Sequence, residues 1–251
     1  MVPGDTPSMR VSDYIPRPPE SLLDVGCNVG AWLEECAGRY PGTRLAGIDI
    51  NESALEVARA RLPVVELHRS GAEAIPFADE TFDCVTCVEV LEHLSVELRP
   101  AAFREMHRVL RPGGLLLLTA PHDGWFAWLD SNNMRHRFPR LIGWLAGRGL
   151  REANYRAIGR KLEWHHHFTL PELLALAEDG WRVAAVRRGG LLMWPLMEWA
   201  CWPFYRLGRA EHPVRRWFER VAIFDYAIDY GRASYGILLV LERAAKNPAS
   251  R

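Results

Sequence analysis

Hydrophobic and polar positions in the first half of the chain alternate between strand-like and helix-like spacing. An apolar run that ends at Asp24 passes into a turn over 26–30, and residues 31–37 then have helical spacing. The same pattern predicts a second strand over 44–51 and a helix over 52–62. Strands that alternate with helices favour a parallel sheet covered by helices.

The pattern continues toward the C-terminus, where strands and helices still alternate. The elements it predicts are a third strand at 64–70, a fourth within 82–88, a helix from 101 that stops at an Arg-Pro-Gly-Gly turn, a buried strand with four consecutive leucines up to 122, a helix between Thr169 and Gly180, a sixth strand from Trp181 and a last strand at 233–243. Two connecting segments, about 123–165 and 191–232, are longer than ordinary connections. We expect one domain over 1–251 with these segments as inserted caps.

Residues 191–207 are apolar and rich in tryptophan. Pro195 and Pro203 predict that no single helix runs through this segment, so no transmembrane helix is expected. Five arginines follow up to Arg220. Apolar aromatic surface beside arginines suits peripheral membrane contact through 191–220, or a segment that covers a bound hydrophobic substrate. Buried core and a homodimer contact are the alternatives.

The turn over 26–30 predicts a ligand site. Gly26 and Gly30 permit φ > 0 and a close approach that a Cβ would block, while the N–H groups of the next helix face the ligand. The dinucleotide fingerprint G-x-G-x-x-G fits poorly, because Asn28 and Ala31 stand where its second and third glycines belong. The turn therefore indicates a different nucleotide-type ligand, and a strand-to-helix turn without a ligand is the alternative.

With Asp24 included, this stretch resembles the D-x-G-C-x-x-G motif of class I S-adenosylmethionine-dependent methyltransferases. Residues 71–94 resemble that family's D-A-E-x-L-P-F, F-D and E-H-L segments, and 108–116 its R-V-L-R-P-G-G-x-L segment. The resemblance covers 22–122. It implies an α/β fold with a Rossmann-like, doubly wound sheet of seven strands, mostly parallel with an antiparallel last strand. It also implies S-adenosyl-L-methionine as cofactor and S-adenosyl-L-homocysteine as product.

The resemblance assigns the cofactor contacts to the carboxyl ends of several strands. It implies that Asp24 meets the ligand ammonium and that Cys87 and Val88 border the methionine part. In doubly wound sheets, an acid about 20 residues after the glycine turn accepts hydrogen bonds from the ribose hydroxyls. Asp49 stands at this position. The alternative is that Asp49 caps the following helix. The complete expected set is Asp24, Gly26, Cys27, Asn28, Gly30, Asp49, Ile50, Ala72, Glu73, Cys87 and Val88.

Two positions depart from the family's pattern. Asn28 replaces a glycine that is common there, and Gly71 stands where an aspartate usually receives the adenine amino group. We expect the backbone of Ala72 or the side chain of Glu73 to take over the contact with the adenine.

Histidines are the candidates for a catalytic base. Methyl transfer to a hydroxyl needs a base, and histidine titrates near neutral pH. We favour His93, because it follows the fourth strand close to the expected methyl donor, and keep His165 as a second candidate; a histidine bonded to backbone is the alternative. The three adjacent histidines at 165–167 share no face and no carboxylate follows at helical spacing, so we expect no metal site.

The charges are unevenly distributed, although the 31 basic and 31 acidic residues balance. Residues 1–121 hold 11 basic and 18 acidic residues, and 122–251 hold 20 and 13, with eight basic residues between 135 and 161. This basic segment leaves an RNA methyltransferase as a second interpretation, although no RNA-binding motif is recognised and nucleic acid is not the favoured partner. A cofactor-binding subunit without catalysis, docked to a partner or membrane, is the third.

Composition completes the prediction. The five cysteines lack metal-binding spacing, which indicates reduced thiols, and the chain opens without a basic-then-apolar leader. We therefore expect a cytoplasmic enzyme with peripheral membrane contact as an option. Its predicted function is O-methylation of a small or lipid-like, or lipid-linked, acceptor by S-adenosylmethionine.

Overall fold

The computed structural model describes residues 10–130, 133, 137, 138, 140, 165–177, 179–206 and 212–245. The strands in this part of the chain are β1 (Ser21–Val25), β2 (Arg44–Asp49), β3 (Glu66–Arg69), β4 (Phe82–Val88), β5 (Leu110–Pro121), β6 (Trp181–Gly189) and β7 (Gly236–Arg243). Its α-helices are α1 (Ala31–Arg39), α2 (Glu52–Arg61), α3 (Arg99–Val109), α6 (Leu170–Leu176), α7 (Met193–Arg206) and α8 (Pro213–Tyr226). Its short 3₁₀ helices are η1 (Val11–Tyr14), η2 (Leu91–His93), η3 (Ala127–Leu129) and η5 (Gly231–Ala233).

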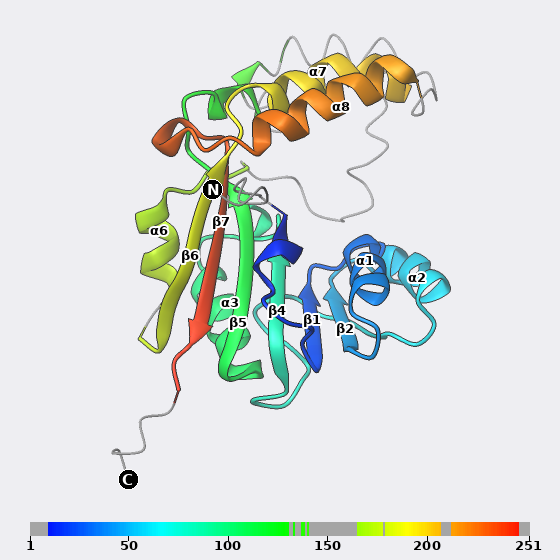
Figure 1. Cartoon of the computed structure of the whole chain (residues 1–251), viewed down its shortest axis with the longest axis vertical. Helices are drawn as coiled ribbons and strands as arrows, with labels where there is room; N and C mark the ends of the chain where they lie inside the picture. Colours follow the sequence, from blue (N-terminus) through cyan, green and yellow to red (C-terminus); the bar gives the residue numbers. More distant parts are fainter. Residues whose placement is uncertain are drawn as a thin grey trace. The chain divides into compact units, whose positions relative to one another are not determined.

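The strands form one sheet in the order β3-β2-β1-β4-β5-β7-β6 (Figure 1). β1 pairs in parallel with β2 on one side and β4 on the other, so that Asp24 lies opposite both Gly47 and Thr86. β7 is the antiparallel strand. The predicted α/β fold, a doubly wound sheet of seven strands with a reversed last strand, is confirmed.

Local sequence explains where the first helices begin. Gly30 adopts φ 76° immediately before α1, a left-handed conformation that glycine reaches without steric cost. The side chain of Asn51 accepts hydrogen bonds from the N–H groups of Ser53 (3.1 Å) and Ala54 (3.4 Å) at the start of α2. Asn51 is thus the cap of α2, which leaves the carboxylate of Asp49 available for other contacts.

The Arg-Pro-Gly-Gly segment is part of β5 and does not form the separate turn that the sequence predicts. Phe82 pairs with Leu110, but the next pair along β4 is Cys84 with Leu115. The extra residues form a bulge in which Gly113 has φ 79°. The prediction was right that α3 ends before this segment and wrong that the strand starts after it.

α7 corrects the prediction that Pro195 and Pro203 prevent a single helix, because it runs from Met193 to Arg206 through both. Pro195 lies in the first turn, where a backbone N–H has no partner within the helix. Pro203 lies in the last turn, where a lost hydrogen bond affects little remaining helix. The two prolines are therefore not the reason to expect no transmembrane helix in this segment. Among the described residues, no helix has both the length and the hydropathy to cross a membrane.

The described residues form two compact units. The sheet unit contains Arg10–Ala120, Pro171–Val186 and the chain from Leu238, and the second unit contains the described parts of Pro121–Leu170 and Arg187–Ile237. Both predicted caps, 123–165 and 191–232, fall in the second unit. The organisation of 1–251 as one domain with two inserted segments stays a prediction.

Candidate functional site

The glycine turn after β1 has the conformation that its sequence indicates. Gly26 has φ 79°, and a Cβ built on it would stand 2.4 Å from a methyl carbon of Val90. The N–H groups of Gly26 and Cys27 both donate to the carbonyl of Ile48, at 2.8 and 2.9 Å. Glycine is therefore required at position 26, both for the backbone conformation and for the space.

Asn28 continues this turn in a left-handed conformation, with φ 48°. Asparagine tolerates this region better than most residues, so the departure from glycine does not distort the turn. The N–H of Asn28 donates to Oδ2 of Asp49 at 2.8 Å, and the N–H of Asn51 donates to Oδ1 at 2.8 Å. Asp49 thus ties the end of β2 to the glycine turn.

Asp24 is a buried acid at the end of β1, with 3% of its surface exposed. The indole Nε1–H of Trp32 donates to Oγ1 of Thr86 (3.1 Å), and the Thr86 hydroxyl donates to Oδ1 of Asp24 (2.8 Å). Burial raises the pKa of the Asp24 carboxyl from its ordinary 3.8 to about 7; the Thr86 hydrogen bond opposes this shift and the charge of Asp49 adds to it. A carboxylate in this setting gains from a positively charged ligand group.

The thiols of the expected site respond to the same acids. Burial and the charges of Asp24 and Asp49 raise the pKa of the Cys27 thiol. Burial and the charges of Glu92, Asp24 and Glu89 raise that of Cys87. Both thiols are therefore neutral at physiological pH, and since both are also buried they are not suited to act as nucleophiles.

The adenine end of the expected site is made by residues after β2 and β3. Ile50 has 39% of its surface exposed, as an apolar wall for a ligand requires, whereas Ala72 is buried. The carboxylate of Glu73 lies over Gly71, so that a Cβ on Gly71 would stand 2.4 Å from Oε2. An acid therefore occupies the space beside position 71 although residue 71 has no side chain.

The end of β4 is held in a fixed conformation. Val88 is the last residue of the strand, and Glu89 follows with φ 53°. The N–H of Glu89 donates to the carbonyl and to the hydroxyl of Thr119, both at 3.2 Å. This sharp bend brings Val90 over Gly26, so the two strand ends meet at one edge of the sheet.

His93 lies in the short η2 and not early on the following α-helix, which corrects the sequence-based expectation; α3 begins only at Arg99. Its side chain is 45% exposed, and its Nε2 is 3.8 Å from Oε1 of Glu92, whose side chain is 1% exposed. The bend at Glu89 ends β4 before a regular helix can start. His93 remains in the sheet unit with the expected cofactor contacts.

His165, the second candidate base, belongs to the second unit and is largely buried. Its Nδ1 is 2.5 Å from Oδ2 of Asp130, and Nε2 of His167 is 2.8 Å from the same oxygen. The backbone of His165 exchanges two hydrogen bonds of 2.8 Å with the side chain of Asn133. This histidine is thus positioned by acid and amide groups from 32 to 35 residues upstream.

Sequence reasoning missed three residues that shape these arrangements: Thr86, Val90 and Asp130. Thr86 could have been found, because a lone hydroxyl in the apolar run CVTCV needs a buried partner. Val90 and Asp130 gave no such signal, since their roles depend on a bend and on contacts between distant segments. Of the eight basic residues between 135 and 161, on which the RNA interpretation rests, only Arg137 and Arg140 are among the described residues.

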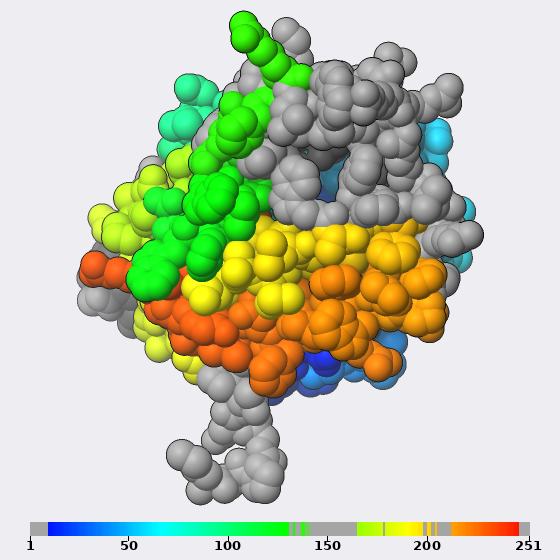
Figure 2. Space-filling view, turned by 90° about the horizontal axis from the view of Figure 1, so that it is seen from above, coloured from blue at the N-terminus to red at the C-terminus, as the bar shows by residue number. Residues whose placement is uncertain are grey.

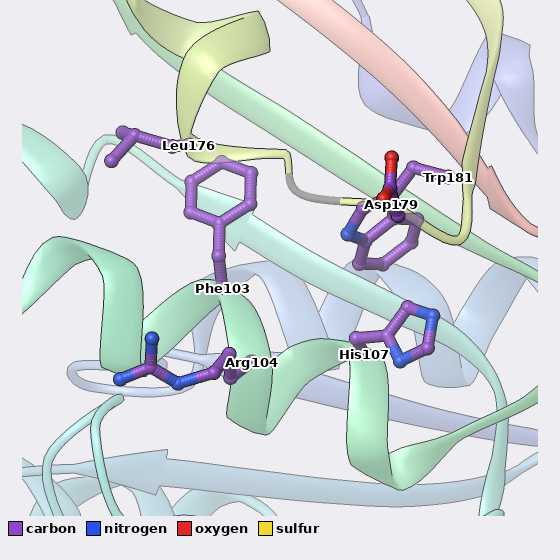
Figure 3. A pocket seen from close by; sticks show the side chains of 6 residues that line it. All are labelled: Phe103, Arg104, His107, Leu176, Asp179 and Trp181. Atoms are coloured by element: carbon purple, nitrogen blue, oxygen red, sulfur yellow. The ribbon is translucent and has the colours of Figure 1, made fainter.

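A cavity of about 90 Å³ lies elsewhere in the sheet unit (Figure 3). It is lined by Phe103, Arg104, His107, Leu176, Asp179 and Trp181. The rings of His107 and Trp181 meet edge to face at 4.9 Å, and burial lowers the pKa of His107. Because Trp181 begins β6 whereas Asp24 and Val88 lie at the carboxyl ends of their strands, this small cavity is distinct from the expected cofactor site.

Comparison with known proteins agrees with this geometry. Residues 23–118 match the family described as "Methyltransferase domain". A demethylmenaquinone methyltransferase of Symbiobacterium thermophilum is 31% identical over 165 residues, which cover 59% of this chain and 62% of that protein. A malonyl-[acyl-carrier protein] O-methyltransferase of Legionella pneumophila is 28% identical over 258 residues, 95% of this chain and 85% of that protein.

A solved structure of an S-adenosylmethionine-dependent methyltransferase from Methanosarcina mazei has the same fold, with a TM-score of 0.60 at 20% identity over 94% of this chain and 97% of that one. The chain spans half or less of the length of several other curated relatives that it matches, 31%, 50% and 40% in three cases. The matched part includes β1, β2 and β4 with the turns that follow them. The chain therefore carries, over residues 23–118, a class I S-adenosylmethionine-dependent methyltransferase domain.

Proposed function

We propose that the protein transfers a methyl group from S-adenosylmethionine to an oxygen atom of a small, lipid-like or lipid-linked acceptor. The observation that carries the methyl-donor part of this proposal is the pair of acids Asp24 and Asp49, which lie at the carboxyl ends of adjacent parallel strands beside the glycine turn. The other interpretations, an RNA methyltransferase and a non-catalytic cofactor-binding subunit, have no comparable support among the described residues.

The chemistry of these groups fits the cofactor. The buried carboxyl of Asp24, whose pKa is about 7, is suited to the cationic amino group of the methionine part. Asp49 ends the second strand, where ribose hydroxyls find their acceptor in doubly wound sheets. Ile50 and Glu73 would bind the adenine, and Cys87 and Val88 would border the methionine part.

When bound, S-adenosylmethionine supplies a methyl group on a positively charged sulfur, and in-line transfer to a nucleophile neutralises that charge. The protein's own contribution is to position both reactants and exclude water, which can supply roughly 7–11 kcal/mol of the barrier. We propose that His93 is the general base that removes the proton of the acceptor hydroxyl. Its side chain is partly exposed and it lies just after β4. Such proton transfer typically contributes about 10²–10⁴-fold in rate.

A lipid-like acceptor is supported by α8. Its inner face packs on α7, where Met197, Cys201 and Ala222 are buried, and the two helices lie side by side (Figure 2). Its outer face exposes 58% of Trp217 and 71% of Phe224. Arg216 and Arg220 lie exposed near these aromatic residues, a combination that suits an anionic membrane surface.

The names of two relatives point in the same direction. One is named for malonyl-[acyl-carrier protein] and for O-methylation, and the other for demethylmenaquinone. Both names describe acceptors other than RNA, and only the first of them specifies an oxygen atom. The five cysteines are free and buried, which supports the proposed cytoplasmic location.

Isothermal titration with S-adenosylhomocysteine tests cofactor binding. We expect micromolar affinity in the wild-type chain and a loss of at least tenfold in Asp24→Ala and in Asp49→Ala. Asp79→Ala is the matched control, because this exposed acid pairs with Arg108 and lies before β4. No binding at tens of micromolar, or equal binding by all variants, would overturn the proposal.

The acceptor class is found by incubating the chain with methyl-labelled S-adenosylmethionine and separate pools of lipids, quinones, sugars and RNA. We expect label in the lipid or quinone pool and its loss in His93→Gln, with cofactor affinity unchanged. Label confined to RNA would replace the proposed acceptor by the RNA interpretation.

Membrane contact is tested by co-sedimentation with vesicles of phosphatidylcholine and phosphatidylglycerol. We expect the wild-type chain to pellet and the Trp217→Ser/Phe224→Ser variant to stay in the supernatant. Equal pelleting of both would reject contact through α8. Sedimentation velocity without vesicles checks the competing outcome, a homodimer formed through the same face.

A further inference from the structure

Three polar side chains of the second unit converge on one buried point. Oδ2 of Asp130 lies 2.5 Å from Nδ1 of His165 and 2.8 Å from Nε2 of His167. The exposed fractions of the three side chains are 1%, 10% and 6%. Buried polar or charged side chains cost free energy unless each has a hydrogen-bond or charge partner. This cluster therefore has a specific structural or chemical role.

We propose that Asp130, His165 and His167 bind a divalent transition metal ion, with Zn²⁺ as the best match. One carboxylate oxygen and two imidazole nitrogens are ligands that zinc accepts, whereas magnesium and calcium prefer oxygen alone. The three candidate ligand atoms lie within 4.8 Å of one another. Three protein ligands leave a fourth position of a tetrahedral zinc ion for water or a ligand.

His167 has the second contact that a metal-bound histidine usually makes. Its Nδ1 is 3.2 Å from the carbonyl oxygen of His122, which can only accept a hydrogen bond. Nδ1 therefore donates to this carbonyl, and Nε2, which faces Oδ2 of Asp130, is the nitrogen that would give up its proton to bind a metal. A backbone carbonyl that fixes the tautomer in this way is a common partner of metal-bound histidine.

The backbone around the cluster is held in place independently of the side chains. The N–H of Phe168 donates to the carbonyl of Pro121 (2.8 Å), and the N–H of Asp123 donates to the carbonyl of Phe168 (3.0 Å). This bridge aligns the segment of His165 and His167 with the chain after β5. The ligand positions are thus preorganised, which reduces the cost of ordering them around an ion.

Only a small adjustment separates the observed contacts from metal coordination. Ligand atoms at about 2.0–2.1 Å from a tetrahedral zinc ion stand roughly 3.3 Å apart, so each imidazole has to retreat from the carboxylate by roughly 0.5–0.8 Å. Rotations of the side chains about χ1 and χ2 provide this movement. This proposal departs from the sequence-based expectation of no metal site at 165–167, which considered only a carboxylate that follows the histidines, whereas Asp130 lies 35 residues before His165.

The experiment uses the full chain without a histidine tag, stripped with EDTA and dialysed. Titration with Co²⁺, a visible substitute for zinc, is expected to give the absorption of a four-coordinate ion that saturates at one equivalent. Zn²⁺ is then expected to displace it, and elemental analysis of the dialysed zinc form is expected to find one zinc per chain. Saturation far below one equivalent would overturn the proposal.

Variants identify the ligands. Asp130→Asn, His165→Gln and His167→Gln are each expected to weaken Co²⁺ binding at least tenfold. His166→Gln is the matched control, because it removes the middle histidine of the same tract, whose ring packs edge to face on Phe168. If His166→Gln weakened binding as much as the others, or Asp130→Asn left it unchanged, the tract would bind metal without this site.

Cofactor binding separates this inference from the proposed function. Asp130→Asn is isosteric, and circular dichroism and thermal unfolding will establish that it is folded. We expect its affinity for S-adenosylhomocysteine to equal that of the wild type, because the expected cofactor contacts lie in the sheet unit. Metal binding can thus fail while the methyltransferase proposal stands, and the reverse also holds.

Discussion

Glu73 holds its carboxylate over Gly71, so close that a Cβ on Gly71 would stand 2.4 Å from Oε2 and 2.5 Å from Oε1 of Glu73. Glu73 therefore supplies a carboxylate beside position 71. The methyltransferase family that the sequence resembles usually has an aspartate at that position. The N–H of Ala74 donates to the carbonyl of Gly71 at 3.2 Å, which closes the turn that brings Glu73 back. Glu73 is also part of the family's D-A-E segment, so this chain keeps one carboxylate at a place where that segment has two.

Glu73→Gln is expected to weaken the binding of S-adenosylhomocysteine about tenfold or more. A hydrogen bond to a charged group contributes about 1.5–3 kcal/mol, and the substitution replaces the charged acceptor by a neutral amide. Isothermal titration measures the change. Glu56→Gln, on the exposed face of α2, serves as the control and is expected to bind like the wild type.

Gly71→Asp tests whether the two acids compete for one place. In the wild-type background the new side chain displaces the Glu73 carboxylate and adds a second negative charge beside it, and we expect weaker binding. In the Glu73→Ala background the space is free, and we expect Gly71→Asp to restore part of the lost affinity. Additive losses in the double variant would show that the two positions do not share a role.

The affinity for S-adenosylhomocysteine is expected to depend on pH through Asp24. Since its pKa is about 7 in the free protein, the carboxyl must lose a proton at lower pH before it pairs with the ligand ammonium. The affinity should therefore fall by up to about tenfold per pH unit below 7 and stay level just above it. Thr86→Val removes a hydrogen bond that lowers this pKa, so it should move the midpoint upward.

The fold could be predicted from the sequence because its elements depend on local patterns. The apolar runs gave the strands, and Gly26 and Gly30 have the positive φ that their turn requires. The same locality explains the errors. A proline was taken to end a helix whatever its position, yet Pro195 lies in the first turn of α7, where it removes no hydrogen bond.

The site was only partly predictable, because some of its contacts join segments that the sequence does not relate. Asp24 and Asp49 could be placed from the ends of their strands. Thr86 required knowledge of the register between β1 and β4, which sets it opposite Asp24. Asp130 meets His165 and His167 only through packing of the second unit, for which no pattern at short range exists.

Asp24→Asn is expected to stabilise the unliganded protein at pH 8 and to abolish tight cofactor binding. The pKa of Asp24 is higher in the folded state, about 7, than in an unfolded chain, about 4, so its contribution to stability is complete below pH 4 and is lost as the pH rises through 7. This loss amounts to roughly 1.4 kcal/mol for each pH unit between the two values.

Urea unfolding of the wild type and of Asp24→Asn at pH 5 and pH 8 measures this effect. The variant lacks the titrating group, so its free energy of unfolding should rise relative to the wild type between the two pH values. If the variant were less stable than the wild type at pH 8, the charged carboxylate of Asp24 would not destabilise the unliganded protein. That result would contradict the view that Asp24 serves ligand binding and lowers stability.

Asp225 in α8 anchors the start of α7, and its removal is expected to loosen the pair of helices. Its Oδ2 accepts from the N–H groups of Leu191 (2.9 Å) and Met193 (3.0 Å), and its Oδ1 accepts from the hydroxyl of Tyr230 (2.9 Å). A negative charge at a helix N-terminus is stabilising, and the partly buried donors would lose their acceptor. We expect Asp225→Ala to cost about 1–3 kcal/mol.

Hydrogen exchange locates the effect of this substitution. In Asp225→Ala the amides of Leu191 and Met193 should exchange faster, while those of β1 and β4 in the sheet unit should not change. Asp229→Ala is the matched control, because this exposed acid accepts only a local hydrogen bond of 2.7 Å from the N–H of Gly231 among the contacts described. Equal acceleration in both variants would mean that the start of α7 does not depend on the buried carboxylate.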